Sequence, residues 1–166
     1  MSFIREFCYG NYKMSLLEER IQYKPFKYPW AYDAWLQQQR VHWLPEEVPL
    51  ADDVKDWHRT LSNSERNLLT HIFRFFTQAD VEVNNCYMKH YSQVFKPTEV
   101  LMMLAAFSNI ETVHVSAYSH LLDTIGMPET EYSAFLKYQQ MKDKYDYMQE
   151  FGVSTNRDIA KTLAMF

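Results

Sequence analysis

The chain of 166 residues lacks the features that mark extracellular, membrane-spanning and nucleic-acid-binding proteins. Its two cysteines, Cys8 and Cys86, have no metal-binding or redox spacing, so no disulfide framework is predicted. There is no long uncharged apolar run, and the start, MSFIREFCYGNYKMS, has no apolar core, which argues against a membrane span or a signal peptide. The net charge is -4 and the basic residues are scattered, so nucleic acid is not an expected partner. A cytoplasmic protein is expected.

Glycine is also scarce, with three residues in the whole chain, and strand-like alternation of apolar and polar residues is rare. The long segments instead carry apolar residues at the helical period, which predicts an all-α protein. A hydrophobic content of 47% is ample for one packed core. We therefore expect a single domain over residues 1–166, made of an amino-terminal arm over residues 1–27 and a helical body over residues 28–166.

Prolines, glycine and capping residues divide the body into helices. Ser62 with Glu65, and Thr155 with Asp158, have the spacing of capping boxes, and prolines suit first helical turns. The expected helices run from Pro29 to near His42, from Val54 to Thr60, from Ser62 to about Tyr91, from Pro97 to about Thr124, over residues 130–149, and from Thr155 onward. The apolar end DIAKTLAMF reads as a helix cut part-way along its length.

Three polar residues interrupt an apolar stripe on the helix that ends near Thr124. The stripe consists of Leu104, Phe107, Glu111, His114, Tyr118, Leu121 and Ile125. Glu111 and His114 diverge by about 60° around the helix, and Tyr118 returns to within about 20° of Glu111 after ~10.5 Å. One buried site can therefore contact all three side chains.

The preceding long helix repeats this pattern, because Asp80 interrupts its apolar stripe of Phe73, Phe76, Val83 and Tyr87. A buried, unpaired carboxylate costs several kcal/mol, whereas a cation stabilises two facing acids and accepts a neutral imidazole as a ligand. Glu-x-x-His is the ligand motif of four-helix di-iron and di-manganese proteins. An isolated motif of this kind is often structural, and a tyrosine on an apolar stripe is commonly a core residue. The inward Asp80 favours the metal interpretation.

At these residues the sequence resembles the small, radical-generating subunit of class I ribonucleotide reductase. That family has an aspartate on one helix and Glu-x-x-His, followed four residues later by a tyrosine, on the next, matched here by Asp80, Glu111, His114 and Tyr118. The segments FFTQADVEVNN and AAFSNIETVHVSAYSHLL resemble its two ligand helices. HWLPEEVPLADD resembles its Trp-x-Pro-Glu-Glu segment, which makes Trp43 the counterpart of the tryptophan on the family's electron-transfer route.

The resemblance implies the front half of a ferritin-like di-metal carboxylate helical bundle. Asp80, Glu111 and His114 would be ligands of an iron, manganese or mixed metal pair that reacts with oxygen. Tyr118 would store the radical, and Trp43 would conduct the electron. The implied partners are a complementary C-terminal chain or half that completes the site, the catalytic large subunit that reduces ribonucleotides, and a second small subunit in a dimer.

Two other functions stay open at this point. A ferritin-like metal-storage or oxidase protein could pair two copies, each supplying Asp80, Glu111 and His114 to a symmetric site. A helical interaction module without metal could instead neutralise its acids by salt bridges. A hetero-assembly with a second polypeptide favours the reductase subunit, a metal-loaded homodimer favours the storage or oxidase protein, and absence of metal uptake favours the interaction module.

Overall fold

The computed structural model describes residues 15–166, and the regular elements within them are all helical. The all-α prediction is therefore confirmed. Of the expected arm, residues 1–14, including Cys8, lie outside the described residues. The described part of the arm contacts the body, because the Lys96 backbone N–H donates to the Leu16 carbonyl at 2.9 Å and the Leu16 side chain packs against the core.

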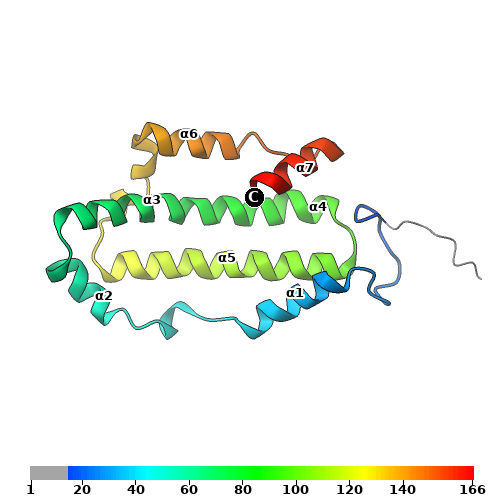
Figure 1. The fold of residues 1–166 in the computed structure, drawn as a ribbon, viewed down its shortest axis with the longest axis horizontal. Helices are drawn as coiled ribbons and strands as arrows, with labels where there is room; N and C mark the ends of the chain where they lie inside the picture. Colours follow the sequence, from blue (N-terminus) through cyan, green and yellow to red (C-terminus); the bar gives the residue numbers. More distant parts are fainter. Residues whose placement is uncertain (1–14) are drawn as a thin grey trace, which may run out of the picture.

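Three long helices position the interior of the molecule: α1 (Pro29–Arg40), α3 (Asn63–Asn85) and α5 (Thr98–Thr124). The ribbon shows α3 and α5 running antiparallel side by side, with α1 on the other side of α5 (Figure 1). The helices α6 (Gln139–Met148) and α7 (Asn156–Met165) lie beyond α3, away from α5. The apolar stripes of α3 and α5 therefore face each other across one interface.

Short elements connect these helices. They are η1 (Pro45–Glu47), α2 (Ala51–Lys55), η2 (Asp56–Thr60), η3 (Cys86–Tyr91), α4 (Ser92–Val94), η4 (Glu129–Glu131) and η5 (Ala134–Lys137), of which η2 and η3 are π-helical. The predicted start of α3 is confirmed, because the Glu65 N–H donates to the Ser62 hydroxyl at 3.3 Å and the Ser62 N–H donates to the Glu65 carboxylate at 2.8 Å. The start of α5 after Pro97 is confirmed too.

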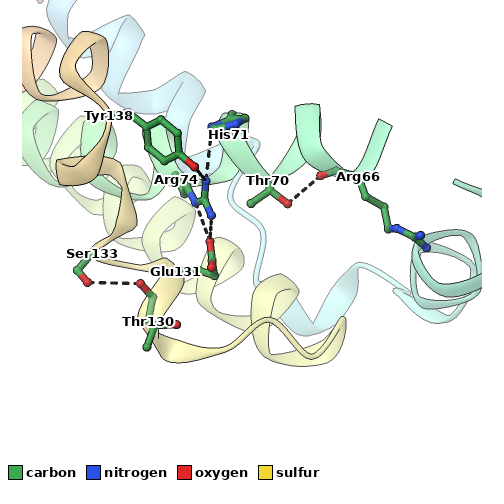
Figure 2. A network of polar contacts seen from close by, with 8 residues as sticks. All are labelled: Arg66, Thr70, His71, Arg74, Thr130, Glu131, Ser133 and Tyr138. Atoms are coloured by element: carbon green, nitrogen blue, oxygen red, sulfur yellow. Dashed lines mark hydrogen bonds and ion pairs between the residues drawn. The ribbon is translucent and has the colours of Figure 1, made fainter. Parts of the chain in front are cut away.

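The helix predicted over residues 130–149 is wrong in its first half, because η4 and η5 precede α6, which begins only at Gln139. Arg74 of α3 explains the difference (Figure 2). Its guanidinium donates to the Glu131 carboxylate at 2.6 Å and to the Tyr138 hydroxyl at 2.9 Å. In a continuous α-helix the backbones of these two partners would lie ~10.5 Å apart along the axis. The turns bring them together.

Helix α5 has the length and mean hydropathy of a helix that could cross a membrane. A central helix of a helical bundle has the same composition, because it must bury apolar residues against several neighbours. Here α5 packs against both α1 and α3. Its polar residues Glu111 and His114 lie next to Asp80 of α3.

Glu99 connects the chain before α1 to the first turn of α5. Its side chain is fully buried, and one carboxylate oxygen accepts hydrogen bonds from the backbone N–H groups of Lys27 at 2.7 Å and Tyr28 at 2.9 Å. Burial raises the pKa of Glu99, but the N–H donors of Glu99 itself, Tyr28 and Lys27 outweigh burial and lower the pKa from its ordinary 4.5. The carboxylate therefore stabilises the native arrangement of α1 while it is ionised.

This anchor predicts acid-sensitive stability. Because the native pKa of Glu99 is lowered, its contribution is present above about pH 4.5 and is lost as the pH falls through the native pKa. We expect the free energy of unfolding of the unmodified chain to fall more steeply in acid than that of Glu99→Gln. Urea titrations followed by circular dichroism between about pH 7 and pH 3 measure both slopes. Glu150→Gln, at an exposed glutamate after α6, is the control, and equal slopes for Glu99→Gln and the unmodified chain would contradict the prediction.

Candidate metal centre

Asp80 of α3 and Glu111 and His114 of α5 converge across the interface between the two helices. One ligand atom from each side chain lies within 4.8 Å of the others, and all three residues are partly buried. The His114 Nδ1 is 3.1 Å from a Glu111 carboxylate oxygen. The convergence expected from the two apolar stripes is therefore present.

The two carboxylates destabilise each other in the absence of a cation. Burial raises the pKa of Asp80, the negative charge of Glu111 raises it further, and His114 offsets part of the increase. A bound cation reverses this effect, because it favours the ionised form of both acids. Two carboxylates with one imidazole form a hard donor set that suits iron or manganese, so the residues present fit half of a di-metal site.

Tyr118 lies on the Asp80 side of this cluster. Its ring stacks on Phe76, with the ring centres 6.2 Å apart and the planes 13° from parallel, and also contacts Phe73 at 6.5 Å. Burial and then the Asp80 carboxylate raise the pKa of Tyr118, so the phenol is protonated near neutral pH. Two aromatic rings thus cover a neutral phenol beside a candidate metal ligand.

Trp43 reaches the cluster from the loop after α1. The centres of its ring and the His114 ring are 6.4 Å apart. Both residues line a cavity of about 390 Å³ together with Asp80 and Tyr118. The His114 side chain is 38% exposed and Phe76 is 42% exposed, so the described residues leave one side of the cluster uncovered. Four of the five residues singled out from the sequence thus line one cavity, and the fifth, Glu111, lies beside Asp80 and His114.

Several neighbours of this cavity were missed by the sequence reasoning. His120 lines the cavity, and so do loop residues Val48 and Leu50. No helical spacing predicts how a loop returns to a helix. By contrast, the buried Ser108 hydroxyl donates to the Asn84 side-chain oxygen at 2.5 Å, one helical turn from Glu111 and Asp80. The spacing of that pair on the two stripes could have revealed it.

A helical bundle in which inward carboxylates meet a Glu-x-x-His motif defines the class of ferritin-like di-metal carboxylate proteins. The sequence profile described as "Ribonucleotide reductase, small chain" matches residues 20–166. The chain belongs to the ribonucleotide reductase small-chain family.

Known relatives and solved structures agree with this assignment. The chain is 52% identical over 141 residues to the probable ribonucleoside-diphosphate reductase small subunit 376L of Invertebrate iridescent virus 6, covering 85% of this chain and 39% of that protein. The corresponding protein 048L of Invertebrate iridescent virus 3 is 43% identical over 136 residues, covering 82% of this chain and 36% of that protein. The chain thus spans about two fifths of the length of these relatives.

The solved structures show the same fold. The ribonucleotide reductase R2 subunit from Clostridium botulinum superposes with a TM-score of 0.78 at 22% identity, covering 87% of this chain and 47% of that one. The dimanganese(II) NrdF protein of Streptococcus sanguinis superposes with a TM-score of 0.69 at 18% identity, covering 80% of this chain and 48% of that one. The helical arrangement of this chain is thus that of about half of a small-subunit fold.

Because the two acids repel each other, removing one charge should stabilise the metal-free chain and weaken metal binding. Because the native pKa of Asp80 is raised, its destabilising effect is absent below about pH 3.8 and grows as the pH rises through the native pKa. We expect Asp80→Asn to raise the urea midpoint of the metal-free chain at pH 7 and to weaken its binding of Fe(II) and Mn(II). Asp123→Asn, on an exposed part of α5, is the control. A lower midpoint for metal-free Asp80→Asn would contradict the prediction.

Proposed function

We propose that this chain is the amino-terminal part of the small subunit of a ribonucleoside-diphosphate reductase, and that it works with a complementary C-terminal chain or half. The observation that carries the proposal is the convergence of Asp80, Glu111 and His114, with Tyr118 beside Asp80 and Trp43 beside His114. Membership of the family supports it. The small subunit makes and holds an oxidant, and the catalytic large subunit reduces the ribonucleotide.

In this proposal Asp80, Glu111 and His114 are ligands of a metal pair, and the completing segment supplies the remaining ligands. The metal pair, when bound, supplies the oxidising chemistry with oxygen. Iron and manganese both suit the donor set, and the NrdF protein of Streptococcus sanguinis is a dimanganese protein. The uncovered side of the cluster, at the exposed part of His114, is where we place the completing segment.

The side chains around the ligands have distinct tasks in the reaction. Tyr118 gives up one electron and its phenolic proton together and so becomes the radical store. Phe73 and Phe76 pack against the Tyr118 ring and hold it in place beside Asp80. Trp43, next to His114, conducts the electron between the centre and the catalytic subunit.

The assembly that this mechanism needs has three kinds of component. One is the completing C-terminal chain or half, another is the large catalytic subunit, and the last is a second small subunit that forms a dimer. We place this assembly in the cytoplasm and treat residues 1–166 as part of one domain. The similarity to small subunits favours this function over the symmetric metal-storage or oxidase homodimer.

The role of Tyr118 predicts a persistent radical. The tagged chain is purified with its natural partners, loaded with Fe(II) or Mn(II), exposed to oxygen, and frozen after several minutes for electron paramagnetic resonance. We expect Tyr118→Phe to abolish the persistent tyrosyl signal and to leave the bound metal unchanged, because only the oxidisable hydroxyl is removed. Tyr132→Phe, whose hydroxyl donates to Asp123 at 3.2 Å, is the control. A persistent signal that survives Tyr118→Phe would assign the radical elsewhere.

The role of Trp43 predicts that radical formation and nucleotide reduction can be separated. Trp43→Phe keeps an aromatic ring beside His114 but removes the more easily oxidised indole. We expect a normal yield of the Tyr118 radical and loss of ribonucleotide reduction in the presence of the large subunit. Trp35→Phe on α1 is the matched control. Unchanged nucleotide reduction by Trp43→Phe would exclude Trp43 from the electron route.

A further inference from the structure

A second tyrosine, Tyr87, has the same spacing from a candidate ligand as Tyr118. Tyr118 follows Glu111 by seven residues on α5, and Tyr87 follows Asp80 by seven residues, in the π-helical segment η3 that continues α3. Because α3 and α5 are antiparallel, the same step along each helix leads to opposite sides of the cluster (Figure 1). Each tyrosine therefore lies about two helical turns along the axis from the level of the two facing acids, Tyr118 on one side and Tyr87 on the other.

The electrostatic coupling agrees with this placement. Burial and then the Glu111 carboxylate raise the pKa of Tyr87, just as burial and then the Asp80 carboxylate raise the pKa of Tyr118. Both phenols are thus neutral near pH 7 and can release an electron only together with a proton. The Tyr87 ring is also held in place by Phe107, with ring centres 5.9 Å apart.

Tyr87 leads to a second buried phenol. The centres of the Tyr91 and Tyr87 rings are 6.0 Å apart, Tyr91 is 4% exposed, and its hydroxyl lies beside the Cys86 thiol without a hydrogen bond of normal geometry among the described residues. Both tyrosines line a cavity of about 340 Å³ on the side of the molecule that includes Phe107 and Leu163. They lie on the π-helical segment η3, and π-helical turns inside helices are frequent at functional sites.

We propose that Tyr87 is a second redox-active tyrosine of the metal centre and that Tyr91 shares its oxidising equivalent. With the metal pair bound and oxidised by oxygen, Tyr87 would lose one electron to it and its phenolic proton to solvent, which would leave a Tyr87 phenoxyl radical. Tyr91 then transfers a hydrogen atom to the Tyr87 oxygen, so that Tyr87 is restored and the radical resides on Tyr91. The inference rests on the proposed function, because the oxidised metal pair is the electron acceptor.

An electron from Tyr87 would be used in the reduction of oxygen at the metal pair. Reduction of one oxygen molecule to water consumes four electrons, of which two divalent metal ions that become trivalent supply two and Tyr118 supplies a third. Tyr87 can supply the fourth electron without consuming the radical stored at Tyr118. The Tyr87 radical is transient, because the path to Tyr91 leads the oxidising equivalent away from the metal pair.

The test detects this radical in the loaded assembly when Tyr118 cannot be oxidised. Tyr118→Phe is mixed with oxygen, freeze-quenched on the millisecond scale, and compared by electron paramagnetic resonance with Tyr118→Phe/Tyr87→Phe. We expect a transient signal in the first variant that narrows when ring-deuterated tyrosine is incorporated, and loss of that signal in the second. Tyr118→Phe/Tyr132→Phe is the matched control and should keep the signal. Peptide mass spectrometry should find oxidised products at Tyr87 and Tyr91 in Tyr118→Phe and in Tyr118→Phe/Tyr132→Phe, and none at Tyr91 in Tyr118→Phe/Tyr87→Phe.

Each other outcome overturns a different statement. A transient signal that deuterated tyrosine does not narrow belongs to a residue such as Trp43 and overturns the role of Tyr87. A tyrosyl signal that persists in Tyr118→Phe/Tyr87→Phe also overturns the role of Tyr87. Absence of any radical in the metal-loaded unmodified assembly overturns the proposed function itself, and this inference with it. Tyr87→Phe keeps the ring contacts with Tyr91 and Phe107, and an unchanged circular dichroism spectrum separates loss of the hydroxyl from loss of the fold.

Discussion

The structure depends on the meeting of two inward carboxylates, Asp80 and Glu111, at the interface of α3 and α5. An interface built from apolar stripes normally excludes such a pair, because each acid loses hydration and repels the other. The raised pKa of Asp80 reflects both effects. A cation removes the repulsion, and the adjacent imidazole of His114 adds a nitrogen ligand, so the feature that destabilises the bare chain is the feature that prepares it to bind metal.

The surrounding structure holds this interface together from several directions. Glu99 fixes the chain before α1 to the start of α5, and α1 leads to the loop that carries Trp43. On the far side of α3, Arg74 binds Glu131 and Tyr138 and so holds the segment that leads to α6 (Figure 2). These contacts are long-range in sequence, and they brace the two helices that carry the candidate ligands.

The antiparallel pairing of α3 and α5 also gives the cluster an approximate symmetry. Each helix contributes an acid and, seven residues later, a tyrosine, and each phenol is influenced by the acid of the opposite helix. The surroundings of the two tyrosines differ, because Phe73 and Phe76 pack on Tyr118 whereas Tyr87 contacts a further phenol at Tyr91. A phenol isolated by apolar rings suits storage of a radical, and a phenol followed by another suits its transfer.

The sequence by itself determined the helical class, the starts of α3 and α5, and the shared faces of Asp80, Glu111 and His114. These features follow from the helical period and from capping bonds within a few residues. Only the tertiary structure decided that residues 129–137 form short 3-10 turns, that Trp43 lies beside His114, and that Tyr87 packs against Phe107. Those outcomes depend on the paths of the loops that connect the helices and on the register in which the helices pack. No local sequence pattern encodes either one.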